Sequence, residues 1–148
     1  KSEQAIPGLI NLLEHENFDV RYSAASALGE IKSEAAIPGL INLLEDENSP
    51  VRRRAASALG QIKSEAAIPG LINLLEDENS SVRYSAASSL GQIKSEQAIL
   101  GLIKLLEDEN SSVRRRAASA LGEIKSEQAI PGLIKLLEHE DSDVRYRA

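Results

Sequence analysis

The sequence predicts an all-α solenoid of about five stacked helical hairpins, and three observations support this prediction. A Lys-Ser-Glu triplet recurs every 31 residues without insertion. Each unit contains two segments with the apolar spacing of a helix face, and aromatic residues make up only 3% of the chain. A single hairpin cannot bury both of its apolar faces, whereas stacked hairpins bury them in one continuous core built from Leu, Ile, Val and Ala.

The 148 residues are expected to form a single repeat domain, because no linker or change in composition separates the units. Four complete units are followed by a fifth that is seven residues short. Such similar units indicate recent duplication or deliberate design. The units span residues 1–31, 32–62, 63–93, 94–124 and 125–148.

The first helix of each unit is predicted from apolar residues at positions i, i+3, i+4 and i+7. Ser2 and Glu3 supply an N-cap and an acid in the first turn. Pro7 lies early in this helix, where a proline removes few internal hydrogen bonds. In the first unit the apolar positions are Ile6, Leu9, Ile10 and Leu13.

The second helix is predicted to begin with Ser49 as its N-cap and Pro50 at the first helical position. The same cap position is held in later units by Ser80, Ser111 and Ser142. Phe18 takes the serine's place in the first unit. Small residues would let this helix pack closely on the first one, giving antiparallel helices of about 13 residues each. A glycine near the end either permits this approach or begins the termination of the helix. These glycines are Gly29, Gly60, Gly91 and Gly122.

Composition excludes several classes of protein. The absence of cysteine rules out disulfides, thiolate metal sites and a cysteine nucleophile. The longest apolar run is about six residues, too short to cross a membrane, and no signal peptide is visible, so a cytoplasmic location is expected. The net charge of -6 argues against general binding of nucleic acid, although charge distribution can override it.

The segment AIPGLINLLEDENSPVRRRAASALGQI resembles the short HEAT-like repeats first associated with phycobilisome lyases, and the resemblance covers all 148 residues. It implies a right-handed superhelix whose second helices line a concave binding face. It implies little about activity, since the family includes chromophore-lyase subunits, hydroxylases and binding scaffolds. This chain departs from the family at the end of the second helix, where lysine replaces the usual glycine. A lysine at positive φ is strained by about 1 kcal/mol, but its charge suits a helix C-terminus.

No catalytic arrangement emerges from the residues. His15 and His139 occupy equivalent turns four layers apart, which is tens of ångströms at about 8–10 Å per packed helix. The His-Glu pairs of iron-dependent HEAT-like hydroxylases lie at the start of the second helix, where this chain has Tyr22-Ser23 and equivalents. No serine has a nearby base, and no phosphate-binding loop exists. We therefore expect a protein that is not an enzyme and that holds no cofactor or metal.

Charged residues follow the repeat. The acidic turns, such as Glu45-Asp46-Glu47, are expected to form a solvated edge. All ten arginines lie in the first two turns of second helices. One arginine recurs in every unit, which predicts a structural ladder that bonds neighbouring carboxylates or helix ends. This arginine is Arg21, Arg52, Arg83, Arg114 and Arg145.

The two positions after the recurring arginine alternate between units, with Tyr-Ser in one unit and Arg-Arg in the next, and they form the candidate site. Tyrosine and arginine are enriched at interface hot spots, so we predict a stripe that binds a protein or peptide partner with acidic groups. The alternative is ordinary solvated helix surface whose alternation was inherited from duplication of a two-unit block. Binding of nucleic acid is less favoured because of the acidic turns. The stripe consists of Tyr22, Ser23, Arg53, Arg54, Tyr84, Ser85, Arg115, Arg116, Tyr146 and Arg147.

The sequence therefore favours a non-catalytic scaffold for protein–protein interaction. Two alternatives stay open: a subunit of a bilin lyase or isomerase, and a consensus-like or engineered repeat protein with no natural ligand. Neither terminal unit has an obvious polar cap, so end-to-end self-association is also expected. It would involve apolar residues at the two ends, such as Ile6, Leu9, Leu136 and Leu137.

Overall fold

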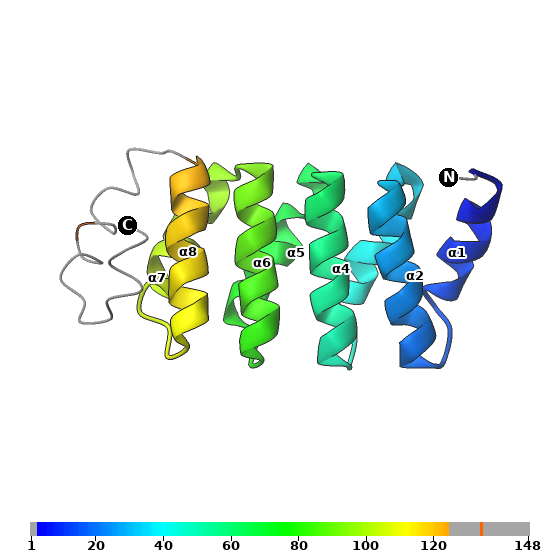
Figure 1. The fold of residues 1–148 in the computed structure, drawn as a ribbon, viewed down its shortest axis with the longest axis horizontal. Coiled ribbons are helices and arrows are strands. Elements are labelled where there is room, and N and C mark those ends of the chain that lie inside the picture. Colours follow the sequence, from blue (N-terminus) through cyan, green and yellow to red (C-terminus); the bar gives the residue numbers. More distant parts are fainter. Residues whose placement is uncertain (1–2, 125–133, 135–148) are drawn as a thin grey trace.

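The computed structural model describes residues 3–124 and residue 134. Over the range 3–124 the chain forms four helical hairpins in a row, with no strand, which confirms the predicted all-α solenoid (Figure 1). The chain ascends through each front helix and descends through the helix behind it, and it coils right-handedly from one layer to the next (Figure 1). No helix among these residues is long and apolar enough to cross a membrane.

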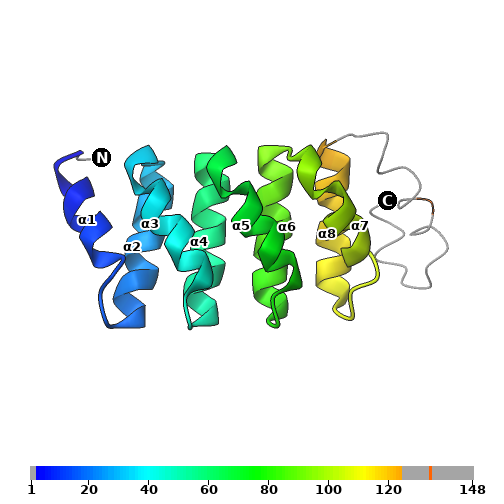
Figure 2. The ribbon, with the colours of Figure 1, turned by 180° about the vertical axis from the view of Figure 1, so that it is seen from behind.

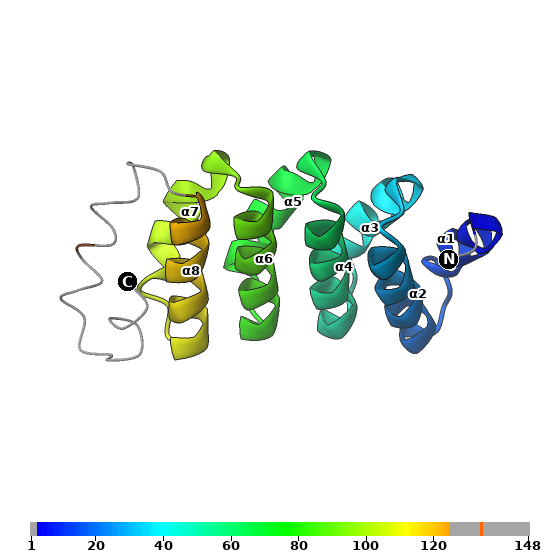
Figure 3. The same cartoon turned by 45° about the horizontal axis from the view of Figure 1, so that its top comes forward.

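The helices form two rows, which Figure 3 separates most clearly. The second helices of the hairpins each span 14 residues and form one row: α2 (Phe18–Ile31), α4 (Ser49–Ile62), α6 (Ser80–Ile93) and α8 (Ser111–Ile124). The first helices form the other row, seen in front in Figure 2: α1 (Ile6–Leu12), α3 (Ile37–Asn42), α5 (Ile68–Asn73) and α7 (Ile99–Leu105).

The first helices are shorter than the expected 13 residues because each is interrupted by tighter turns. A proline is the second residue of α1, α3 and α5, and it has no N–H to donate to the carbonyl four residues earlier, which favours a tighter turn there. The same turn precedes α7, where Leu100 replaces proline, so proline is not its only cause. The leading 3-10 turns are η1 (Glu3–Ala5), η2 (Glu34–Ala36), η4 (Glu65–Ala67) and η6 (Glu96–Ala98). Closing 3-10 turns follow α3 and α5: η3 (Leu43–Glu45) and η5 (Leu74–Glu76).

The N-caps of the second helices are asparagines rather than the predicted serines. The side chain of Asn79 accepts hydrogen bonds from the backbone N–H groups of Ser81 and Val82 at 2.8 and 3.3 Å. Its extended backbone places the carboxamide oxygen over these free donors. The serine is therefore the first helical residue, and Pro50 is the second. Asn48 makes no such side-chain bond, because Pro50 lacks the N–H that Ser81 provides.

The second helices α2, α4 and α6 each end on a lysine in the left-handed conformation. Lys32, Lys63 and Lys94 have φ values of 60°, 61° and 62°. The N–H of Lys32 bonds to the carbonyl of Gly29 and the next N–H, of Ser33, bonds to that of Leu28, both at 3.1 Å. These two bonds satisfy helix carbonyls in a Schellman motif. Lysine thus occupies the positive-φ position where the family usually has glycine.

Glycine permits close approach between second helices of neighbouring repeats. A Cβ on Gly29 would lie 2.9 Å from both Cα and Cβ of Ala58 in α4. The second helices pack mainly on one another, so the small residues serve this contact rather than the contact within each hairpin that we predicted. Ser89 adds a buried bond across it, from its Oγ to the carbonyl oxygen of Ala56 at 2.6 Å.

Candidate functional site

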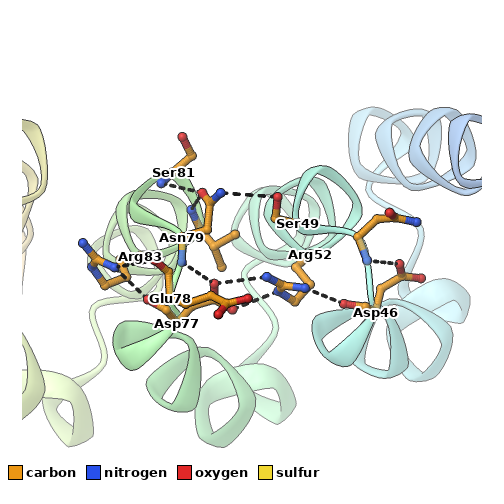
Figure 4. Close-up of polar contacts among 10 residues, drawn as sticks. Asp46, Ser49, Arg52, Asp77, Glu78, Asn79, Ser81 and Arg83 are labelled. Carbon is orange, nitrogen blue, oxygen red and sulfur yellow. Dashed lines mark hydrogen bonds and ion pairs between the residues drawn. The ribbon is translucent and has the colours of Figure 1, made fainter.

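An arginine–aspartate ladder joins the turns of successive repeats (Figure 4). Arg52 of α4 donates from Nε and one terminal nitrogen to the two carboxylate oxygens of Asp77, at 2.8 and 3.2 Å. Its other terminal nitrogen donates to the backbone carbonyl of Asp46 at 2.7 Å. The same fork joins Arg21 to Asp46 and Arg83 to Asp108, which confirms the predicted ladder for three of its arginines. Arg145 lies outside the described residues.

The ladder corrects the expectation of a solvated acidic edge. The side chain of Asp77 is only 9% exposed, whereas its neighbours Glu76 and Glu78 are exposed. Asp77 also accepts a hydrogen bond from the backbone N–H of Asn79 at 2.9 Å. The central aspartate of each turn is therefore a structural residue, and only the flanking glutamates face solvent. The 25-residue spacing of arginine and aspartate was visible in the sequence, but it did not identify the partner.

His15 occupies the corresponding turn position in the first repeat. It is exposed, and its Nδ1 accepts the hydrogen bond from Asn17 N–H at 3.0 Å that an aspartate oxygen accepts in later repeats. Its backbone carbonyl accepts from Arg21 at 2.7 Å. His139 lies outside the described residues. Within the part of the chain that the structure describes, no group of three or more His, Cys, Asp or Glu side chains could hold a metal ion.

The stripe residues pair across repeats instead of standing apart. Arg54 donates to the hydroxyl of Tyr22 at 2.8 Å, and its guanidinium carbon lies 4.9 Å from the centre of the tyrosine ring. Arg116 makes the same contacts with Tyr84, at 3.1 and 5.1 Å. Each pair combines a hydrogen bond with a cation–π contact and links consecutive second helices. The sequence alternation therefore encodes modules of two repeats.

The arginines change the acidity of the first tyrosine. The hydrogen bond from Arg54 lowers the pKa of Tyr22 below its ordinary value of 10.0, because a cationic donor stabilises the phenolate. Burial opposes this shift, and the charges of Arg54 and Arg53 add to it. Arg53 itself lies with its guanidinium carbon 5.8 Å from the Tyr22 ring centre.

The remaining stripe residues differ in exposure. Ser23 is exposed, whereas the equivalent Ser85 is only 8% exposed and does not project into solvent as predicted. Arg115 donates to the Oγ of Ser112 at 3.2 Å. Tyr146 and Arg147 lie outside the described residues.

Positive charge is concentrated on the row of second helices. The helices α4 and α6 contain no carboxylate, while the acidic residues of these repeats lie in the first hairpin segments and turns. The ladder arginines are paired with aspartate, but Arg53 and Arg54 make no ion pair with any residue of the described range. This face can therefore attract an acidic partner.

Comparison with known proteins identifies the repeat. A family model described as HEAT repeats matches residues 1–46, 37–104 and 99–148. The chain belongs to the HEAT-repeat family. This confirms the expected HEAT-like repeat type, and with it the tandem architecture inferred from the 31-residue period.

Solved structures place this HEAT-repeat chain near both natural and engineered solenoids. The complex of CpcE and CpcF of phycocyanin lyase from Nostoc sp. PCC7120 contains a chain 34% identical to it, with a TM-score of 0.86 over 99% of this chain and 63% of that one. An engineered protein is 28% identical, with a TM-score of 0.74 over 96% of this chain and 75% of the other. A designed armadillo repeat protein in complex with the peptide (KR)4 is 22% identical, with a TM-score of 0.77 over 97% and 79% of the two chains, and shows the fold alone. No curated protein sequence matches the chain.

Proposed function

We propose that this HEAT-repeat chain is a non-catalytic scaffold that binds a protein or peptide partner with acidic groups. The binding surface is the face of the second helices, which the family resemblance leads us to expect to be concave. One observation carries the proposal: α4 and α6 display arginine and tyrosine on a face from which carboxylates are absent. Tyrosine and arginine are the side chains most enriched where interfaces derive their binding energy.

The test uses two fluorescent peptides of equal length, one rich in glutamate and one rich in lysine. The glutamate-rich peptide should bind the chain, and binding should weaken as salt is added. Reversing charge with Arg54→Glu and Arg116→Glu should abolish binding, because both guanidinium groups lie on the proposed face. The control is Lys104→Glu in α7, at a lysine whose side chain is 78% exposed. Equal binding of both peptides, or equal loss in the control, would contradict the proposal.

A second candidate is a subunit of a bilin lyase or isomerase. The observation that favours it is the 34% identity to a chain of the phycocyanin lyase complex, extending over 99% of this chain. This chain spans 63% of that neighbour, so any shared activity is itself a proposal. Adding free bilin to the purified chain tests it: a shifted and saturable visible absorption spectrum supports a lyase subunit, and an unchanged spectrum refutes one.

A third candidate is a consensus-like or engineered repeat protein without a natural ligand. It is favoured by the structural match to an engineered protein at 28% identity. The chain would then bind neither the glutamate-rich peptide nor bilin. Specific binding of either probe would exclude it.

We also propose that copies of the chain associate end to end. A Cβ on Gly8 of α1 would meet nothing within 4 Å among the described atoms, whereas one on the equivalent Gly39 would lie 2.8 Å from Leu13 Cδ1 of the preceding repeat. No described residue covers this side of α1, and Leu12 in the same helix is 38% exposed. Light scattering should report a mass that rises with concentration, and a monomer at every concentration would refute this.

A further inference from the structure

A pocket of about 340 Å³ opens on the second-helix face at the first turns of α6 and α8. Seven of its eight lining residues are polar, and none of them is acidic. The apolar one is Val113, which is itself buried. The polar lining includes Arg53, Ser81, Tyr84, Asn110 and Ser112.

Arg53 supplies an uncompensated positive charge to this pocket. It makes no ion pair with any described residue, and it contacts Tyr22 only weakly: its guanidinium carbon lies 5.8 Å from the ring centre, and its hydrogen bond is the smallest of the influences on the pKa of that tyrosine. A guanidinium has five N–H donors, so most of the hydrogen-bonding capacity of Arg53 is available to a ligand. The other arginines of the same helix are already engaged, Arg52 by Asp77 and Arg54 by a tyrosine hydroxyl.

A single sequence difference leaves Arg53 without an acceptor in its own helix. In the fourth repeat, Arg115 donates to the hydroxyl of Ser112, three residues earlier. The residue three positions before Arg53 is Pro50, which has no hydroxyl. The arginines hold equivalent positions in their repeats, but only the later one has an acceptor within its own helix.

Neutral donors surround the charge. The side-chain oxygen of Asn110 accepts from the N–H of Val113 at 3.1 Å, which leaves the NH₂ of this carboxamide to donate. The hydroxyl of Tyr84 accepts from Arg116 and keeps its own proton for donation. Serine hydroxyls, including that of Ser81, complete the lining. The pocket therefore combines a guanidinium fork with several donors and no competing carboxylate.

We propose that this pocket receives the phosphoryl group of a phosphorylated side chain on the partner peptide. Arginine binds phosphate through two parallel hydrogen bonds, and three terminal oxygens can use more of the surrounding donors than the two oxygens of a carboxylate. The inference rests on the proposed function, because the pocket lies on the partner-binding face. It specifies a phosphoryl group as the acidic group of the partner that this face binds.

The first test adds inorganic phosphate to the full nitrogen-labelled chain and follows it by NMR. The side-chain N–H signal of Arg53 and the backbone signals of Ser81 and Asn110 should shift and saturate. Arg53→Gln should abolish these shifts, while Lys104→Gln, which removes one charge from the other row of helices, should preserve them. Shifts that survive Arg53→Gln would overturn the proposal.

Pro50→Ser is a second variant that retains the charge. It gives Arg53 the hydroxyl partner that Ser112 gives Arg115, so phosphate should bind more weakly. Phosphate affinity that is unchanged by Pro50→Ser would contradict the argument that a free guanidinium creates the site.

The second test compares one peptide sequence carrying phosphoserine, glutamate or serine at its centre. The phosphoserine peptide should bind most tightly, and Arg53→Gln should weaken it at least about tenfold, the value expected when a charged hydrogen bond is lost. Equal affinity for phosphoserine and glutamate would overturn the phosphoryl assignment and leave the proposed function intact. Binding of inorganic phosphate with no binding of any acidic peptide would overturn both.

Discussion

Removing one carboxylate from the ladder should destabilise the solenoid strongly. Asp77→Asn preserves the size of the side chain but deletes the charge that faces the Arg52 guanidinium at 2.8 Å. The two side chains are only 9% and 12% exposed, so water cannot replace the lost partner effectively. Breaking a buried pair costs about 3–5 kcal/mol. We expect about 3 kcal/mol, because Arg52 retains its bond to the carbonyl of Asp46.

The adjacent residue provides the control. Glu76 meets Lys104 at 3.8 Å, with both side chains 78% exposed. Glu76→Gln deletes the same charge in the same turn, but exposed pairs contribute only about 0.2–1 kcal/mol. We therefore expect Glu76→Gln to cost less than about 1 kcal/mol.

The assay is urea unfolding of both variants and the parent chain, followed by far-ultraviolet circular dichroism. The Arg52→Gln single variant and the Arg52→Gln, Asp77→Asn double variant complete a thermodynamic cycle, which should reveal a coupling energy above about 1 kcal/mol. The reasoning is refuted if Asp77→Asn costs no more than Glu76→Gln. It is also refuted if the effects of the two ladder substitutions simply add.

Two further predictions concern the helix ends and the tyrosine pair. Lys63→Gly should raise the free energy of unfolding by about 1 kcal/mol in thermal melts, since Lys63 has φ of 61° and glycine accepts this conformation without strain; a lower melting temperature would contradict this. In a chain whose other two tyrosines are replaced by phenylalanine, ultraviolet absorbance should show Tyr22 losing its proton below pH 10, and Arg54→Gln should return the transition toward 10. Because the pKa of Tyr22 is lower in the folded chain, the phenolate stabilises the fold above pH 10, and this stabilisation disappears as the pH falls through the pKa of the folded chain. An identical titration in Arg54→Gln would reject the role of Arg54.

Much of the local structure could be predicted from sequence because its causes lie within one repeat. The apolar spacing around Leu13 predicted the first helix, and the recurrence of Arg52 and its equivalents predicted a ladder of charged hydrogen bonds. The serine caps were predicted wrongly because Asn and Ser both favour the N-cap position, and the proline after Ser49 fits the second helical position as well as the first. Only the backbone conformation shows which one faces the free N–H groups.

The candidate site was predicted as a set of positions but not as an arrangement. The alternation of Tyr22 with Arg54 was visible in the sequence, whereas their hydrogen bond depends on the spacing and rotation of neighbouring helices. The lack of an ion pair for Arg53 likewise depends on the positions of side chains in the neighbouring repeats. These contacts form between side chains of different repeats, and the period of the sequence does not predict their geometry.

The sequence alone determined that this protein is an α-solenoid, because one 31-residue pattern repeated along the chain can bury its apolar faces only by stacking. Tertiary structure decided what each charged residue does. It buried Asp77 against an arginine while leaving Glu76 in water, and among the described residues it left Arg53 without a carboxylate partner beside a polar pocket. The physical reason is that burial and hydrogen-bond geometry at a residue are set by the neighbouring repeat, at contacts of about 3 Å that helical spacing cannot specify.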